Sequence, residues 1–441
     1  MSNTNLEICE TRESAKKPSR TIFIIGMAVI LLSITIKNLT PINLPPIIIL
    51  ALCCALALVS DRDELLTMVT VCIPLSAAFQ YKYFILAATI IYIVKFGKDI
   101  KYKYGIIPLL LMMALELAHG AFFTFSLYLY LRNFAELIFC TVFLMCEHKK
   151  IDYQLIVRTL AVSSLVMMTI VLLNLLKQTG YNFQAIFEGT YRFGVGNEET
   201  VEYGVNYNAN KLGFIANLSV AGLLQLNLAK VGKKIDYVMI LMLALFGILT
   251  MSRTFLLISA LIITLFIFST QASLITRTRN VLLIAIFIIA IFFFVKQTMP
   301  FIISRFSERF MVDDISNGRA GLFAFYTDHI FSSLKYMLVG IGLQNYGDRI
   351  FEIYGHFENV CHNGPQEVIV CWGFIGLGLF IWFIYELISG TKKASTRKLI
   401  NFIPIIITLV AVQAGQLISN GDILLRFTLC AASLLWNPQE A

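Results

Sequence analysis

The sequence predicts an all-α fold, a polytopic membrane helix bundle, and two properties of the chain lead to that prediction. Of its 441 residues, 58% are hydrophobic and only 14% are charged, and the mean hydropathy is +0.77. Soluble domains carry about a quarter charged residues, so this composition is typical of an integral membrane protein. The second property is that apolar residues recur in segments separated by polar connections. We therefore expect one bundle of apolar helices.

Fourteen apolar segments are candidates for membrane-spanning helices. A span needs about 20 residues and several segments are shorter, so we expect about 12–14 transmembrane helices. In chain order the segments are Thr21–Ile36, Pro46–Ser60, Leu65–Gln80, Tyr83–Phe96, Ile106–Gly120, Leu127–Cys146, Gln154–Leu176, Asn208–Ala229, Ile235–Met251, Thr254–Thr270, Asn280–Val295, Pro365–Ile388, Leu399–Ile418 and Ile423–Trp436.

Charges between the segments predict the side of the membrane that each connection faces. The net charge is +8, and basic residues gather in alternate connections such as Lys95–Lys103, Lys230–Lys234 and Lys392–Lys398. Basic residues favour the cytoplasmic side, so both termini are expected in the cytoplasm. The positive charge then reflects topology, and no nucleic-acid partner is expected. No cleavage site follows the first apolar segment, which we expect to be retained as a span.

This topology divides the chain into four regions. Residues 1–20 are a cytoplasmic tail, residues 21–295 hold the first and larger set of helices, residues 296–364 are a long extracytoplasmic loop, and residues 365–441 hold the last helices and the C-terminus. A smaller outer loop covers residues 177–207. In the long loop, apolar residues recur at helical spacing over Arg319–Leu338, which predicts a helix lying along the outer interface.

Polar residues at the outer ends of the segments form the candidate site. Topology gives them one depth, at the outer boundary between water and lipid. Charged groups near hydrocarbon are costly and are usually paired, directed into a cavity or functional. Arginine binds phosphate groups through paired charge-assisted hydrogen bonds, so the set favours an anionic ligand such as a pyrophosphate. The candidates are Arg192 and Asn197 in the smaller loop, Asn208, Asn210, Lys211, Ser252, Arg253, Arg319, His362 and Asn363.

Each candidate also has an ordinary explanation. Arg192 can be a solvated loop residue, and Arg253 can be an anchor whose side chain extends to the interface. Arg319 can cap or anchor the surface helix, and His362 can be a loop histidine.

Among the ionisable residues inside apolar segments, we single out four. Arg132 and Glu136 are one helical turn apart, which predicts an ion pair on one face of a helix. Glu116 and Arg426 lie toward the outer ends of their segments and give a weaker signal of the same kind.

Neither a metal nor a cofactor is expected. Glu352, His356, Glu358 and His362 are residues of ligand type, but their spacing matches no strong zinc pattern. The chain also has no phosphate-binding loop of the kind found in nucleotide-dependent enzymes.

Five short stretches occur in an order that resembles a known family. They are YRFGVGN with NYNANKLGF, then LTMSRTFLL, NGRAGLF, LVGIGLQNYG and CHNGPQEVIVCWGFIGLGLF, between Tyr191 and Phe380. Together with the hydropathy, they are similar to the bacterial superfamily of O-antigen polymerases and O-antigen ligases. The chain departs from the family at Gly364 and Pro365, where an aromatic or aliphatic residue usually follows the histidine–asparagine pair.

The resemblance implies a metal-independent membrane glycosyltransferase whose donor is an undecaprenyl-pyrophosphate-linked oligosaccharide. On the matching positions, Arg192, Arg253 and Arg319 hold the pyrophosphate, and His362 acts on the acceptor hydroxyl. Asn210, Lys211 and Asn363 are expected to contact substrate. The implied location is the bacterial cytoplasmic membrane, and a chain-length regulator protein is an expected partner.

Three functions are compatible with these residues. The favoured one is a polymerase that joins lipid-linked repeat units of a surface polysaccharide, such as O-antigen or capsule. The second is an O-antigen ligase that transfers the glycan to lipid A–core. The third is a flippase or transporter for the lipid-linked oligosaccharide, which more often shows paired repeats, broken helices and charges near the midplane. Here the charges lie at outer segment ends, which favours an enzyme.

Overall fold

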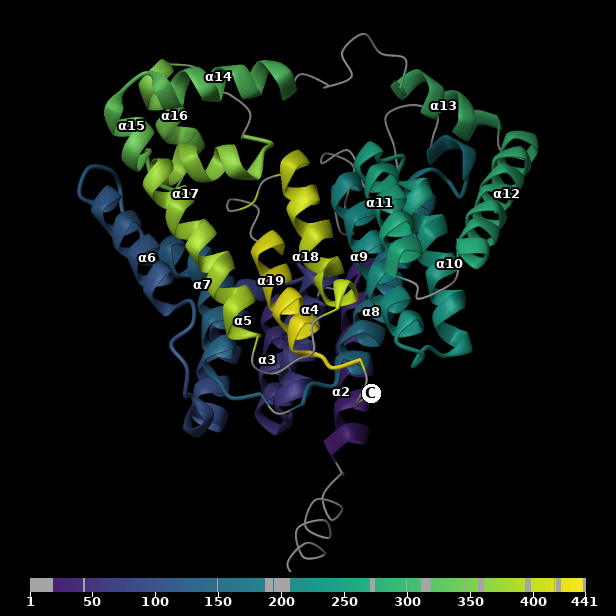
Figure 1. The fold of residues 1–441 in the computed structure, drawn as a ribbon, viewed down its shortest axis with the longest axis horizontal. Helices are drawn as coiled ribbons and strands as arrows, with labels where there is room; N and C mark the ends of the chain where they lie inside the picture. The colour runs from purple at the N-terminus through teal and green to yellow at the C-terminus, as the bar shows by residue number, and fades with distance from the viewer. Residues whose placement is uncertain are drawn as a thin grey trace, which may run out of the picture.

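The computed structural model describes residues 19–42, 44–148, 150–186, 193, 207–269, 274–298, 300–310, 319–344, 346–355, 361–392, 398–415, 417 and 422–438. These residues fold mainly into helices (Figure 1). They contain no β-strand, apart from an isolated antiparallel bridge between Ile100 and Cys146. The predicted all-α class is therefore confirmed for the described part of the chain.

Every predicted apolar segment contains a helix, and most observed ends lie within a few residues of the predicted ones. The helices are α2 (Ser19–Leu39), α3 (Pro46–Val59), α4 (Arg62–Leu75), α5 (Tyr81–Phe96), α6 (Ile106–Gly120), α7 (Leu127–Met145), α8 (Tyr153–Gln178), α9 (Ala209–Leu228), α10 (Lys234–Leu249), α11 (Arg253–Ser269), α12 (Leu274–Thr298), α17 (Gly364–Gly390), α18 (Leu399–Ala411) and α19 (Asp422–Leu435).

Several of these helices can cross a membrane. Among the described residues, five helices are long and apolar enough by length and composition: Arg20–Leu39 within α2, and α7, α8, α9 and α17. Shorter apolar helices, α3, α6, α11, α18 and most of α19, pack between and around them (Figure 1). The described chain is therefore a helical bundle with membrane-spanning character.

Buried polar side chains in the bundle are paired across helices. The Tyr153 hydroxyl of α8 donates to Gln225 Oε1 of α9 at 2.8 Å. Gln225 Nε2 donates to the Ile400 carbonyl of α18 at 2.6 Å and to Ser433 Oγ of α19 at 3.0 Å. Because buried polar groups are costly unless they are hydrogen-bonded, this amide fixes how the four helices are aligned.

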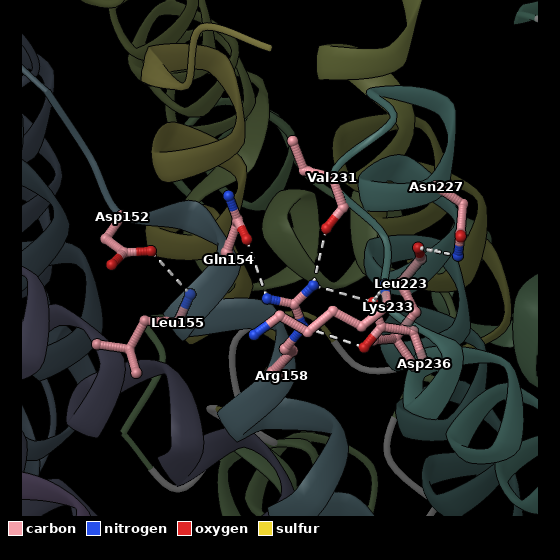
Figure 2. Close-up of polar contacts among 9 residues, drawn as sticks. All are labelled: Asp152, Gln154, Leu155, Arg158, Leu223, Asn227, Val231, Lys233 and Asp236. Carbon is pink, nitrogen blue, oxygen red and sulfur yellow. Dashed lines mark hydrogen bonds and ion pairs between the residues drawn. The ribbon is translucent and has the colours of Figure 1, made fainter. Parts of the chain in front are cut away.

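Arg158 joins α8 to the turn between α9 and α10 (Figure 2). Its Nε and Nη2 donate to the two carboxylate oxygens of Asp236, each at 3.0 Å, and Nη2 also donates to the Val231 carbonyl at 2.9 Å. Nη1 donates to Gln154 Oε1 at 2.9 Å. The guanidinium group is thus used within the protein, and we assign it a structural role.

The predicted ion pair between Arg132 and Glu136 is wrong. Glu136 of α7 is fully buried where α7 packs on α5, and its Oε1 lies 3.7 Å from Lys82 Nζ of α5. The Tyr81 hydroxyl donates to the same oxygen at 3.3 Å. Arg132 instead lies over the Tyr128 ring, 5.5 Å from its centroid. The physical reason is that α5 packs on this face of α7 and brings a cation and a hydroxyl to Glu136.

The described part of residues 296–364 forms short helices at one end of the bundle, which we call the loop end (Figure 1). These are α13 (Pro300–Phe310), α14 (Arg319–Phe331), α15 (Leu334–Val339) and α16 (Tyr346–Tyr354). The helix predicted over Arg319–Leu338 is therefore two helices. They are separated because Ser333 caps α15, with its Oγ accepting from Tyr336 N at 3.2 Å.

Backbone contacts attach the segment after α15 to α17. Gly373 interrupts α17 with φ 64° and ψ −170°, a conformation that is essentially restricted to glycine. This break frees carbonyl groups, and the amides of Ile341 and Gly342 donate to Val370 O at 3.0 Å and Cys371 O at 2.7 Å. A side chain at Gly373 would clash with the Leu338 carbonyl. The glycine therefore allows α15 to approach the backbone of α17 closely.

Candidate functional site

The candidate residues come from the starts of four helices, α9, α11, α14 and α17. Figure 1 shows α14 lying across the loop end, above the start of α17. The N-terminus of a helix carries a partial positive charge and unsatisfied amide groups, so it attracts anions. The contacts described next show how these helix starts are connected.

Asn210 and Ser252 connect the starts of α9 and α11. Ser252 Oγ donates to Asn210 Oδ1 at 2.8 Å, and the same Oγ accepts from Phe255 N at 3.2 Å. The backbone amide of Asn210 donates to Asn208 Oδ1 at 2.9 Å, which caps α9. Arg253, the residue after Ser252, is therefore fixed beside the start of α9.

Lys211 lies at the same helix start. Its ammonium group is 5.4 Å from the centroid of the Tyr207 ring. The Tyr207 hydroxyl is bonded in turn to the end of α4, donating to the Ile73 carbonyl at 3.1 Å and lying 3.1 Å from Ser76 Oγ. These contacts hold Lys211 near the loop end of α9.

Gln366 connects the start of α17 to α14. Its Nε2 donates to the Phe323 carbonyl at 2.7 Å and to Thr327 Oγ1 at 3.0 Å. Asn363 caps α17, because its Oδ1 accepts from Gln366 N at 3.0 Å, and its Nδ2 donates to Gln413 O at 3.4 Å. Asn363 thus holds the loop that carries His362, and a contact of Asn363 with substrate stays a prediction.

Arg253, Arg319 and His362 act on one another electrostatically. Burial and the positive charge of Arg253 lower the pKa of the Arg319 guanidinium. Burial and the positive charge of Arg319 lower the pKa of the His362 imidazole. Each side chain is only partly exposed. The charge of Arg253 thus acts on Arg319 and that of Arg319 on His362, and the convergence of all four predicted residues stays a prediction.

The fourth residue, Arg192, lies outside the described residues, as does Asn197. The neighbouring Phe193 is buried and stacks on Phe246 of α10, with ring centroids 5.8 Å apart. The position of Arg192 stays a prediction.

Tyr346 supports the His362 loop from α16. Its hydroxyl accepts from the amide of Cys361 at 3.0 Å, one residue before His362. Burial and the nearby carboxylate of Glu367 raise the pKa of the Tyr346 hydroxyl. Sequence reasoning missed both residues. Glu367 gave a usable signal, since it is an acidic residue within an otherwise apolar run.

Glu116 and Glu367 both bind backbone amides. Glu116 is buried and accepts from Leu343 N at 2.8 Å, Gln344 N at 3.1 Å and Trp372 Nε1 at 2.7 Å. Glu367 Oε2 accepts from Leu417 N at 2.5 Å. Glu116 therefore holds the segment after α15, which is a structural role.

Arg426 is buried in α19 near the start of α9. Its guanidinium carbon lies 3.5 Å from the centroid of the Phe214 ring, one turn beyond Asn210 on α9. Arg426 therefore places a further positive charge near the start of α9.

The arrangement suits an anionic ligand next to a proton acceptor. Two guanidinium groups and several helix starts favour a phosphate group. Burial and the charge of Arg319 lower the pKa of His362, which favours the neutral imidazole that can accept a proton. Among the described residues, no three His, Cys, Asp or Glu side chains are grouped as metal ligands. His356 and Glu358 lie outside them.

Comparison with known proteins adds no assignment. The chain matches no family model and no curated protein.

Proposed function

We propose that the chain is a membrane glycosyltransferase that polymerises undecaprenyl-pyrophosphate-linked oligosaccharide repeat units of a surface polysaccharide. One observation carries the proposal. Arg253 is the first residue of α11, Arg319 is the first residue of α14 and His362 lies just before α17, and the charges of Arg253 and Arg319 lower the pKa of Arg319 and His362, respectively. Two partly buried like charges repel each other, and a diphosphate bound between them would stabilise the arrangement.

In the proposed reaction, the bond between the anomeric carbon of the donor sugar and the pyrophosphate oxygen breaks. The bonding electrons leave with the pyrophosphate, and Arg253 and Arg319 stabilise the charge that develops there. A hydroxyl of the acceptor sugar forms the new bond to the anomeric carbon. Its proton passes to His362, whose lowered pKa keeps the imidazole unprotonated beforehand.

The loop end is then on the extracytoplasmic side of the cytoplasmic membrane, and the polyprenyl tail stays in lipid. Basic residues support this orientation, because several gather at helix ends remote from the loop end. Arg20 pairs with Asp152 at 2.7 Å, and Lys95 donates to the Leu58 carbonyl at 2.9 Å. In this topology about 12–14 helices span the membrane and both termini are cytoplasmic.

The decisive experiment incubates the purified full chain in lipid nanodiscs with one defined lipid-linked repeat unit. A polymerase forms a ladder of products that differ by one repeat unit, without any other acceptor. Product that forms only after lipid A–core is added would instead identify a ligase. Transfer of the substrate between leaflets without product would identify a transporter. Either of the last two results would reject the proposed polymerase.

A further inference from the structure

A separate polar pocket lies at the loop end, between the turn that joins α6 to α7 and helix α16. Its volume is about 440 Å³, and its walls include Phe122, Phe123, Thr124, Gln344, Asp348 and Glu352. None of the residues in its walls is one of the candidate site residues. Their side chains must therefore be explained separately.

Gln344 is the most informative residue in the pocket wall. Its side chain is 3% exposed, and its Oε1 accepts from the backbone amide of Ser126 at 2.9 Å. Its backbone amide donates to Glu116. Within the described residues, Gln344 Nε2 has no hydrogen-bond partner. A buried donor without a partner is costly, and Gln344 lies in the pocket wall, so a ligand oxygen that reaches this donor from the pocket would stabilise it.

The charges around the pocket disfavour an anionic ligand. Asp348 and Glu352 are exposed and lie one helical turn apart on α16. The cations at the pocket, Arg349 in its wall and Lys335 beside Phe122, are used within the protein. Arg349 donates to Ile341 O at 2.5 Å and lies 4.4 Å from the centroid of the Phe123 ring, and Lys335 lies 5.1 Å from that of Phe122. A phosphate here would meet two carboxylates, whereas hydroxyl groups can donate to them.

The pocket also presents an aromatic surface. Phe122 is 74% exposed, although it is a large apolar side chain. Pockets that bind polar small molecules commonly combine aromatic walls with a few directed polar groups. A sugar ring fits both parts, because its C–H face packs on an aromatic ring while its hydroxyls bond to amides and carboxylates.

We propose that this pocket binds a neutral saccharide, and that it holds sugar residues of the glycan remote from the bond being formed. The assignment to the glycan substrate rests on the proposed function, whereas saccharide binding as such does not. The segment that includes helix α16 connects the pocket to the loop that carries His362. Gln344, Asp348 and Glu352 lie in the pocket wall, and Tyr346 of the same segment holds the amide of Cys361 beside His362.

The test uses the full chain in detergent and the oligosaccharide released by mild acid from the lipid-linked glycans of the native cells. This probe lacks pyrophosphate, and its affinity is measured by calorimetry and saturation-transfer NMR. Gln344→Glu keeps the acceptor for Ser126 N and removes the Nε2 donor. Phe122→Ala removes the exposed aromatic ring of the pocket wall. Each variant should weaken binding about tenfold.

Two controls separate this inference from the proposed function. Phe331→Ala removes an exposed aromatic ring outside the pocket, and Arg319→Ala alters the candidate anion site. Both should bind the oligosaccharide as the wild type does. In a parallel titration with inorganic pyrophosphate, Arg319→Ala should lose affinity and Gln344→Glu should not.

Any of the following results would overturn the pocket assignment. The wild type does not bind the oligosaccharide, Gln344→Glu and Phe122→Ala bind it as tightly as the wild type does, or Arg319→Ala loses oligosaccharide binding. Pyrophosphate binding that depends on Gln344 would show an anion site instead, and would also reject it. If the wild type does not bind pyrophosphate, the proposed function is rejected while the saccharide result is unaffected.

Discussion

Arg253, the first residue of α11, lies close enough to Arg319, the first residue of α14, for its positive charge to lower the pKa of Arg319. Like charges at partly buried helix starts repel each other, and the arrangement is stabilised when an anion binds between them. The positive charge of Arg319 in turn lowers the pKa of His362, and we propose that the three residues form a site with two cations and one base. The following predictions test what these neighbours do.

Replacing either arginine should reduce polymer formation strongly. We expect Arg253→Ala and Arg319→Ala each to lower the initial rate of ladder formation about 10²- to 10³-fold, because each removes charge stabilisation of the departing diphosphate. Arg279→Ala, which changes an exposed arginine at the start of α12, is the control and should retain the wild-type rate. A near-normal rate in Arg319→Ala would remove that residue from the site.

The pH dependence of the rate should report His362. A base works only when it is unprotonated, so the rate rises as pH rises through its pKa and is constant above it. Since burial and Arg319 lower this pKa, the midpoint of the acid limb should lie below 6.5, the ordinary value. Arg319→Gln removes the positive charge, so the acid limb of its residual activity should move to higher pH. An unchanged acid limb would contradict the interaction.

Glu116 should matter for stability and not for binding of the donor. Glu116→Gln replaces a buried carboxylate that accepts three hydrogen bonds with an amide, in which one of the two accepting oxygens becomes an NH2 donor. We expect the free energy of unfolding in detergent to fall by about 1.5–3 kcal/mol. Glu386→Gln is a matched control, because Glu386 also accepts from a tryptophan Nε1 (Trp382, 3.1 Å) but is not buried. Equal thermal stability of the two variants would argue against the anchoring role.

Gly373 should not tolerate a side chain. Gly373→Ala places a Cβ against the Leu338 carbonyl and forces a non-glycine residue into φ 64°, so we expect about 1–3 kcal/mol of backbone strain in addition to the clash. The readout is the yield of folded protein and its thermal stability. Gly378→Ala lies in the same helix with nothing within 4 Å of the added Cβ, and it should be neutral or slightly stabilising.

The apolar helices could be predicted from the sequence because hydrophobic runs are a local property. Each helix in the bundle coincides with a run of apolar residues, and capping residues such as Asp61 and Ser126 set several of the helix starts. The same approach predicted that Arg253, Arg319 and His362 lie at one end, because helices that alternate in direction bring every second connection to the same side.

Interactions between helices could not be predicted in this way. Glu136 has Lys82 as its partner because α5 packs on that face of α7, and no spacing within α7 contains this information. Glu116 likewise meets backbone amides of Leu343 and Gln344 from a distant segment.

The sequence by itself determined the all-α fold class, the positions of the apolar helices and the residue types available for the proposed chemistry. Only the tertiary structure decided which charges lie together, where the helix predicted over Arg319–Leu338 is divided, and that Gln344 faces a pocket. The physical reason is that helix formation depends on neighbouring residues in the chain, whereas pairing and pocket formation depend on which helix faces pack together.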